Sequence, residues 1–79
     1  MESRKQNKKF LIELNKEEAI VLFDWVCRFN QKTNSDSFED QSEERILWDI
    51  EAILEKISDD ILDDKYNDIL LEARKNIRD

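Results

Sequence analysis

The stretch Glu17–Asn30, EEAIVLFDWVCRFN, decides how this chain folds. It is the most apolar run in a sequence in which 42% of the residues are charged. At about 100° per residue its apolar side chains cover more than half of a helix; they are Ala19, Ile20, Leu22, Phe23, Trp25, Val26, Cys27 and Phe29. A surface helix carries an apolar stripe only a little wider than about 100°. The stretch therefore predicts a central helix that is covered from at least two sides, with Trp25 in the core.

Two further helices are expected to provide this cover. Asn15 followed by Glu18 is typical of a capping box and predicts that the central helix spans residues 16–31. Ser37 or Asp40 is expected to cap a second helix over residues 40–57. Its stripe is Ile46, Leu47, Ile50, Ile53, Leu54 and Ile57. A third helix over residues 64–78 carries the stripe Tyr66, Ile69, Leu70, Ala73 and Ile77.

The N-terminal segment has a different pattern. Residues 1–9 are basic and polar, and we expect them to be frayed. Phe10, Ile12 and Leu14 recur with the period of a strand, which predicts extended structure over residues 10–14. No obvious partner strand is present in the chain, so this segment either covers the helices or pairs with a second copy in a homodimer through Phe10–Leu14. The predicted fold is all-α: a single domain over residues 1–79, formed as a compact three-helix bundle with an extended or strand-like N-terminal segment.

The composition excludes several kinds of catalytic and cofactor site. The sequence has no glycine, which rules out glycine-rich phosphate loops and dinucleotide fingerprints. It has no histidine, which removes imidazole as a base or metal ligand. No nucleophile–base pair can be assembled, and we expect a protein that is not an enzyme and has no cofactor and no metal. The least favoured alternative is a metal-dependent hydrolase that uses its carboxylates. The acidic stretch 58–64, SDDILDD, lacks the spacing of a calcium loop and is expected to be a solvated turn with Ile61 and Leu62 directed inward.

The expected compartment is the cytoplasm. No apolar run approaches the roughly 20 residues of a membrane span, and the basic N-terminus lacks the apolar region of a secretory signal. The single cysteine, Cys27, cannot form an internal disulfide, and its place on the apolar arc indicates an inert packing residue.

Charge is concentrated in the middle of the chain. Residues 36–64 carry twelve acidic and two basic side chains, a local charge of −10 in a protein of net charge −7. Nucleic acid is an unsuitable partner for such a segment, because binding to phosphates requires positive charge. A basic protein surface is a better match. The alternative is that the acidity only keeps a small domain in solution.

One tryptophan lies outside the predicted core pattern. Trp48 projects about 160° from the middle of the second helix's stripe, among charged residues. It is either a binding anchor, because tryptophan is frequent among interface hot spots, or it is buried beneath the segment Phe10–Leu14. We expect a small regulator or inhibitor that binds a protein through the outer face of the second helix. The candidate contact residues are Phe38, Glu39, Asp40, Glu43, Glu44, Trp48, Glu51 and Glu55.

The combination of EEAIVLFDWVCRFN with FEDQSEERILWDIEAILEK resembles small acidic bacterial proteins to which no functional family is assigned. The resemblance covers residues 12–79, and its most distinctive parts are Phe38-Glu39-Asp40-Gln41 and Leu47-Trp48. It implies no activity and no catalytic residue. In size and acidity alone, the chain is also similar to immunity proteins, antitoxins and phage inhibitors.

Overall fold

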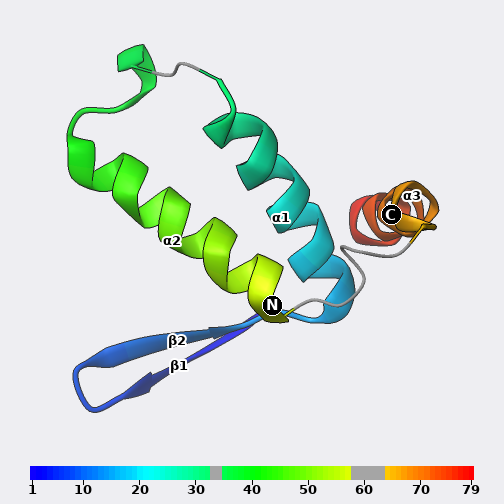
Figure 1. Ribbon diagram of the computed structural model, residues 1–79. Coiled ribbons are helices and arrows are strands. Elements are labelled where there is room, and N and C mark those ends of the chain that lie inside the picture. Colours follow the sequence, from blue (N-terminus) through cyan, green and yellow to red (C-terminus); the bar gives the residue numbers. More distant parts are fainter. Residues whose placement is uncertain (33–34, 58–63) are drawn as a thin grey trace.

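The chain forms three helices and one β-hairpin in the computed structural model, which describes residues 1–32, 35–57 and 64–79 (Figure 1). The strands are β1 (Glu2–Gln6) and β2 (Lys9–Glu13). The helices are α1 (Lys16–Asn30), α2 (Gln41–Ile57) and α3 (Tyr66–Arg78), with a 3-10 turn η1 (Ser35–Ser37) before α2. Each helix lies within two residues of its predicted bounds. The expectations for the SDDILDD turn, including Ile61 and Leu62, fall largely on residues 58–63, outside the described residues.

Helix α1 begins with the predicted capping box. The Asn15 side chain accepts a hydrogen bond from the Glu18 backbone N–H at 2.8 Å, and Glu18 Oε1 accepts one from the Asn15 N–H at 2.9 Å. These bonds satisfy two backbone donors that a helix start otherwise leaves unpaired. The extensive helix contacts are those of α1 with α2 and of α1 with α3. The prediction that this helix is covered from two sides is therefore confirmed.

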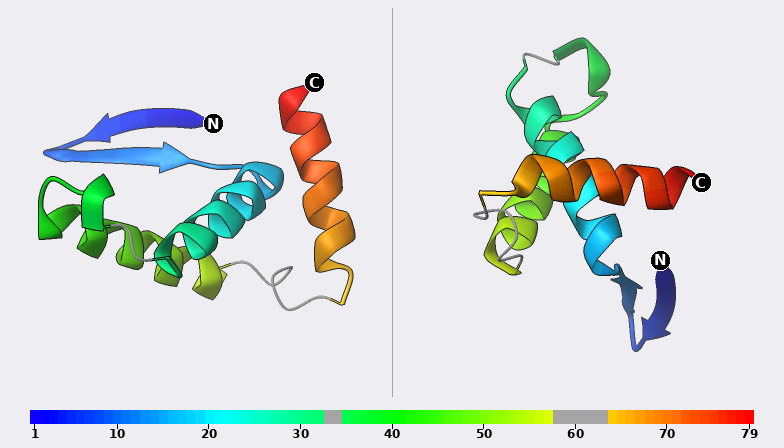
Figure 2. Two further views of the ribbon diagram at one scale, coloured as in Figure 1. Left: turned by 90° about the horizontal axis from the view of Figure 1, so that it is seen from above. Right: turned by 90° about the vertical axis from the view of Figure 1, so that its right-hand side faces the viewer.

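Helix α3 packs on α1 through an apolar cluster and a carboxylate. Its core residues Leu70 and Ala73 meet Ile20 of α1. Beside them Asp24 of α1 accepts hydrogen bonds from Tyr66 and Arg74 of α3 and from Arg28 of its own helix. The distances are 3.1 Å from Tyr66 Oη, 2.9 Å from Arg74 Nη2 and 2.9 Å from Arg28 Nε. Figure 2 shows α3 running across the direction of α1 and α2.

Helix α2 packs on α1 with only part of its predicted stripe. Leu54 is buried and Leu47 half-buried, whereas Ile46 and Ile53 are each 58% exposed. Asn30 Nδ2 of α1 donates to the Leu47 carbonyl at 3.4 Å and to Glu51 Oε1 at 2.7 Å, so the contact is centred between the leucines and Glu51. The helix is turned away from the orientation that its hydrophobic pattern predicts. The expected core position of Trp25 is also wrong, because this residue is 45% exposed.

The N-terminal hairpin contradicts the predicted all-α class, and the fold is mixed α/β. Strands β1 and β2 form a two-stranded antiparallel sheet in which Ser3 pairs with Ile12 and Lys5 with Phe10. Residues 2–6, which were expected to be frayed, are the partner that β2 appeared to lack. The turn is made by Asn7 at φ 57°, a left-handed conformation that asparagine tolerates better than most residues.

The hairpin was missed because β1 is polar at every position and shows no alternation.

The predicted compact bundle is corrected as well. Helices α2 and α3 pack on different sides of α1, and the hairpin extends away from the helices (Figures 1 and 2). Within the described residues, no helix combines the length and the apolar character needed to cross a membrane.

Candidate functional site

The strongest candidate surface is one side of α2 centred on Trp48. Glu44, Trp48, Glu51 and Glu55 recur at spacings of three and four residues, which places them on one side of the helix. We call these four residues the Trp48 face. Trp48 is 45% exposed. The extensive contacts of β2 are with β1 and those of α2 are with α1, so the strand does not cover this face.

The negative charge of this face is visible in its effect on a neighbouring thiol. Cys27 of α1 has a pKa of about 11 instead of 9.0. Burial is the largest cause, and the carboxylates of Glu51, Asp24 and Glu55 add to it because they oppose a thiolate. The carboxylates of Glu51 and Glu55 on α2 and of Asp24 on α1 therefore all oppose ionisation of the Cys27 thiol. The Trp48 face is adjacent to this thiol.

One carboxylate of the face is held in place by the fold. Glu51 is half-buried and accepts the Asn30 hydrogen bond described above, so its side chain is oriented by the α1–α2 contact. Glu44 is half-buried and Glu55 is exposed. The face thus combines a large, partly exposed aromatic ring with carboxylates, one of which is already positioned. Such an arrangement is suited to binding a cationic surface, because less side-chain freedom is lost on association.

The other four predicted contact residues form a separate group at the start of α2. Asp40 Oδ2 accepts a hydrogen bond from the Ser42 N–H at 2.8 Å, which caps the helix as expected. The Ser42 hydroxyl and N–H lower the pKa of Asp40. Glu43 Oε1 accepts from the Glu39 N–H at 3.1 Å, and Phe38 packs edge-on against Phe29, with ring centroids 5.6 Å apart. The side chains of Phe38, Asp40 and Glu43 and the backbone N–H of Glu39 make these contacts at the entry into α2, and the structure does not join the four residues to the Trp48 face.

A second surface was not predicted, because its residues have the pattern of a helix core. Ile46, Ile50 and Ile53 lie on the other flank of α2, and we call them the isoleucine ridge. Cys27 lies on the flank of α1 that is nearest to Glu51 and Glu55. The opposite flank of α1 therefore lies on the same side of the helix pair as the isoleucine ridge. That flank carries Trp25 stacked on Phe29, with ring centroids 5.0 Å apart. Apolar periodicity could locate these residues, but it does not specify which part of a wide stripe the neighbouring helix covers.

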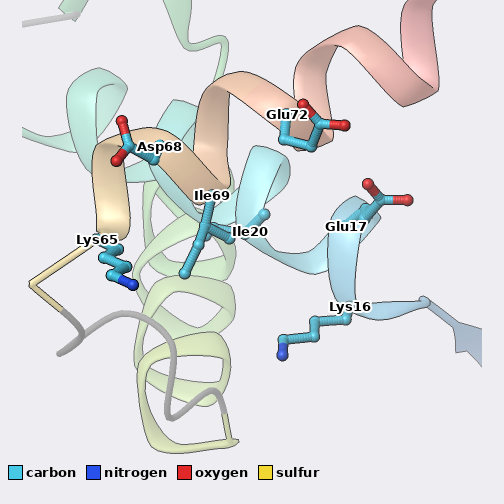
Figure 3. Close-up of a pocket in the computed structure, with 7 residues that line it drawn as sticks. All are labelled: Lys16, Glu17, Ile20, Lys65, Asp68, Ile69 and Glu72. Carbon is cyan, nitrogen blue, oxygen red and sulfur yellow. The ribbon is translucent and has the colours of Figure 1, made fainter.

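A small open pocket lies between α1 and α3. It has a volume of about 370 Å³ and is lined by Lys16, Glu17, Ile20, Lys65, Asp68, Ile69 and Glu72. In Figure 3 the two isoleucines form its base, and charged side chains of both signs surround them. Because the lining carries both positive and negative side chains, it does not favour a ligand of either charge. Among the residues that the structure describes, no group of three or more Cys, Asp and Glu side chains could hold a metal ion.

Comparison of the chain with protein-family models, with curated proteins and with solved structures found no match.

Proposed function

We propose that this protein is a non-enzymatic interaction module, a small regulator or inhibitor that binds a basic protein surface through the Trp48 face. The observation that carries the proposal is the partial exposure of Trp48 among three carboxylates on a single side of α2. Tryptophan is one of the residues that most often dominate the binding energy of an interface.

The surrounding charges support a cationic partner. Glu44, Glu51 and Glu55 lie on the same side of α2 as Trp48, and the carboxylates of Glu51 and Glu55 help to raise the pKa of Cys27. Electrostatic complementarity of this kind accelerates association and orients the partner before contact. Binding should therefore weaken as the salt concentration rises, because exposed charges are screened.

The proposal is tested by affinity capture from a cell extract, followed by titration of each purified binder. Trp48→Ala should weaken binding by about 2 kcal/mol, roughly 30-fold in Kd, as is typical of a hot-spot residue. Glu44→Lys should weaken it through charge reversal. In a Trp25→Phe background Trp48 is the single tryptophan, because the chain has two, and its fluorescence then reports binding directly.

Two matched controls separate this face from the rest of the molecule. Trp25→Ala removes a tryptophan that is exposed to the same extent but lies on α1. Asp49→Lys makes the same kind of charge reversal on α2, outside the Trp48 face. Both controls should retain binding. If folded Trp48→Ala and Glu44→Lys proteins retain every basic partner at wild-type affinity, the proposed function is wrong.

A further inference from the structure

The Trp48 face carries negative charge that its own chain does not neutralise. In the part of the chain that the structure describes, no lysine or arginine forms an ion pair with the three carboxylates of this face. On a helical wheel Arg45 and Lys56 stand about 60° and 80° to one side of Trp48, and the three carboxylates stand on its other side. A cation that binds these carboxylates therefore comes from another molecule.

The indole ring of Trp48 is also without a cation of its own chain. The ring is 45% exposed. Among the described residues, the aromatic ring that carries a cation is Phe10, whose centre lies 5.9 Å from Lys5 Nζ. The face of an indole is electron-rich, and tryptophan is the aromatic residue that attracts cations best. Arginine takes this position more often than lysine, because its guanidinium group is planar and more weakly hydrated than an ammonium group.

Glu51 provides an oriented carboxylate beside this ring. It follows Trp48 by three residues, and side chains at that spacing are neighbours on a helix. Asn30 Nδ2 donates to Glu51 Oε1 at 2.7 Å, which positions the carboxylate before a partner arrives. A carboxylate has about four acceptor positions, so Glu51 can also accept two parallel N–H groups from the edge of a guanidinium. An ammonium group acts as a point charge and gains less from this orientation.

We propose that the Trp48 face recognises arginine. The guanidinium group of an arginine exposed on the partner lies on the indole ring of Trp48 and donates two hydrogen bonds to Glu51. The proposal rests on the function proposed above and adds which cation the partner presents. Glu44 and Glu55 lie before and after this pair along α2 and attract further basic residues of the partner without selecting their type.

The test compares hexa-arginine with hexa-lysine, two peptides of equal length and charge, by isothermal titration calorimetry at one low salt concentration. The wild-type protein should bind hexa-arginine at least about fivefold more tightly, which is the effect of one cation–π contact. Trp48→Leu should bind both peptides equally, through charge alone. Trp25→Leu changes the equally exposed tryptophan of α1 and should keep the preference for arginine.

A matched pair of carboxylate variants tests the role of Glu51. Glu51→Gln and Glu55→Gln each remove one negative charge from the Trp48 face. Glu55→Gln should weaken the binding of both peptides by the same factor, so that the preference for arginine remains. Glu51→Gln should reduce the preference. Asn30→Ala should reduce it as well, because this variant keeps the charge of Glu51 and removes only the hydrogen bond that orients it.

Several results would overturn the proposal. They are equal binding of the two peptides by the wild-type protein, binding of neither peptide, a preference for arginine that survives in Trp48→Leu, and equal effects of Glu51→Gln and Glu55→Gln on the preference. If circular dichroism shows that Trp48→Leu is unfolded, Trp48→Met replaces it with the same expected outcome. The proposed function has a separate readout in the captured partner. A partner that Trp48→Ala releases supports that function even if the two peptides bind equally, so the two failures are distinguishable.

Discussion

At the scale of single residues, two titrating groups report how α1 is surrounded. Burial raises the pKa of Tyr66 to about 12, and its hydrogen bond to Asp24 acts in the same direction. The pKa of Cys27 is raised by burial and by carboxylates of two helices. The sequence predicted an inert Cys27 from its place on the apolar arc. It could not reveal that Glu51 and Glu55 lie close to the thiol, because that proximity depends on how α2 is rotated about its axis.

The Cys27 thiol should therefore be slow to alkylate. Only the thiolate reacts, and a pKa near 11 instead of 9.0 lowers the thiolate fraction near neutral pH by about 100-fold. The measurement is the iodoacetamide rate against pH on the folded protein. The control carries Asn67→Cys in a Cys27→Ala background, which places one thiol at an exposed position of α3. Equal rates for the two thiols below pH 9 would contradict the buried, negatively surrounded environment of Cys27.

At the scale of elements, local signals predicted the helices well and the hairpin only in part. The capping box at Asn15 and Glu18 is a contact within one short segment, so the sequence pattern alone predicts it. The strand β2 was predicted from its alternation. Its pairing with β1 was not, because β1 is exposed on both faces and no burial requirement shapes its sequence. Exposed strands thus leave a weaker sequence signal than buried ones.

The capping box makes a prediction for stability. Asn15→Ala removes the side-chain acceptor of the Glu18 N–H and should lower the free energy of unfolding by about 1 kcal/mol. The measurement is the urea midpoint at constant slope. Asn67→Ala makes the same substitution at an exposed position of α3, and we expect a much smaller loss. A loss as large for Asn67→Ala as for Asn15→Ala would mean that the cap contributes nothing specific.

At the scale of the whole molecule, α1 organises the structure as its apolar width indicated, but the arrangement around it differs from a bundle. The prediction assumed that every apolar residue of α2 faces the core. In the structure the ridge faces outward, and Asp24, on the narrow polar side of α1, joins α1 to α3. Side-chain packing between the helices decides which part of a wide apolar stripe each neighbour covers. Hydrophobic periodicity in the sequence does not specify that packing.

Asp24 should consequently control the attachment of α3. Asp24→Ala removes the acceptor for Tyr66 and Arg74, and we expect a loss of about 2 kcal/mol, the range for hydrogen bonds to a charged group. Amide hydrogen exchange should accelerate in α3 while amides of α1 that face α2 remain protected. The control is Asp49→Ala on an exposed position of α2. Uniform acceleration over all three helices would show instead that the helices open together.

Among the described residues, the two largest fully buried side chains, Ile20 and Val26, both belong to α1. In the same part of the chain α1 packs extensively against two helices, whereas α2 and α3 each pack extensively against α1 alone. A change in the sequence of α1 must therefore fit two neighbours at once. Selection on the folded state should therefore fall unevenly along the chain. A library of single substitutions should tolerate the fewest replacements in residues 16–30, and new sequences for either outer helix should be accepted independently of each other.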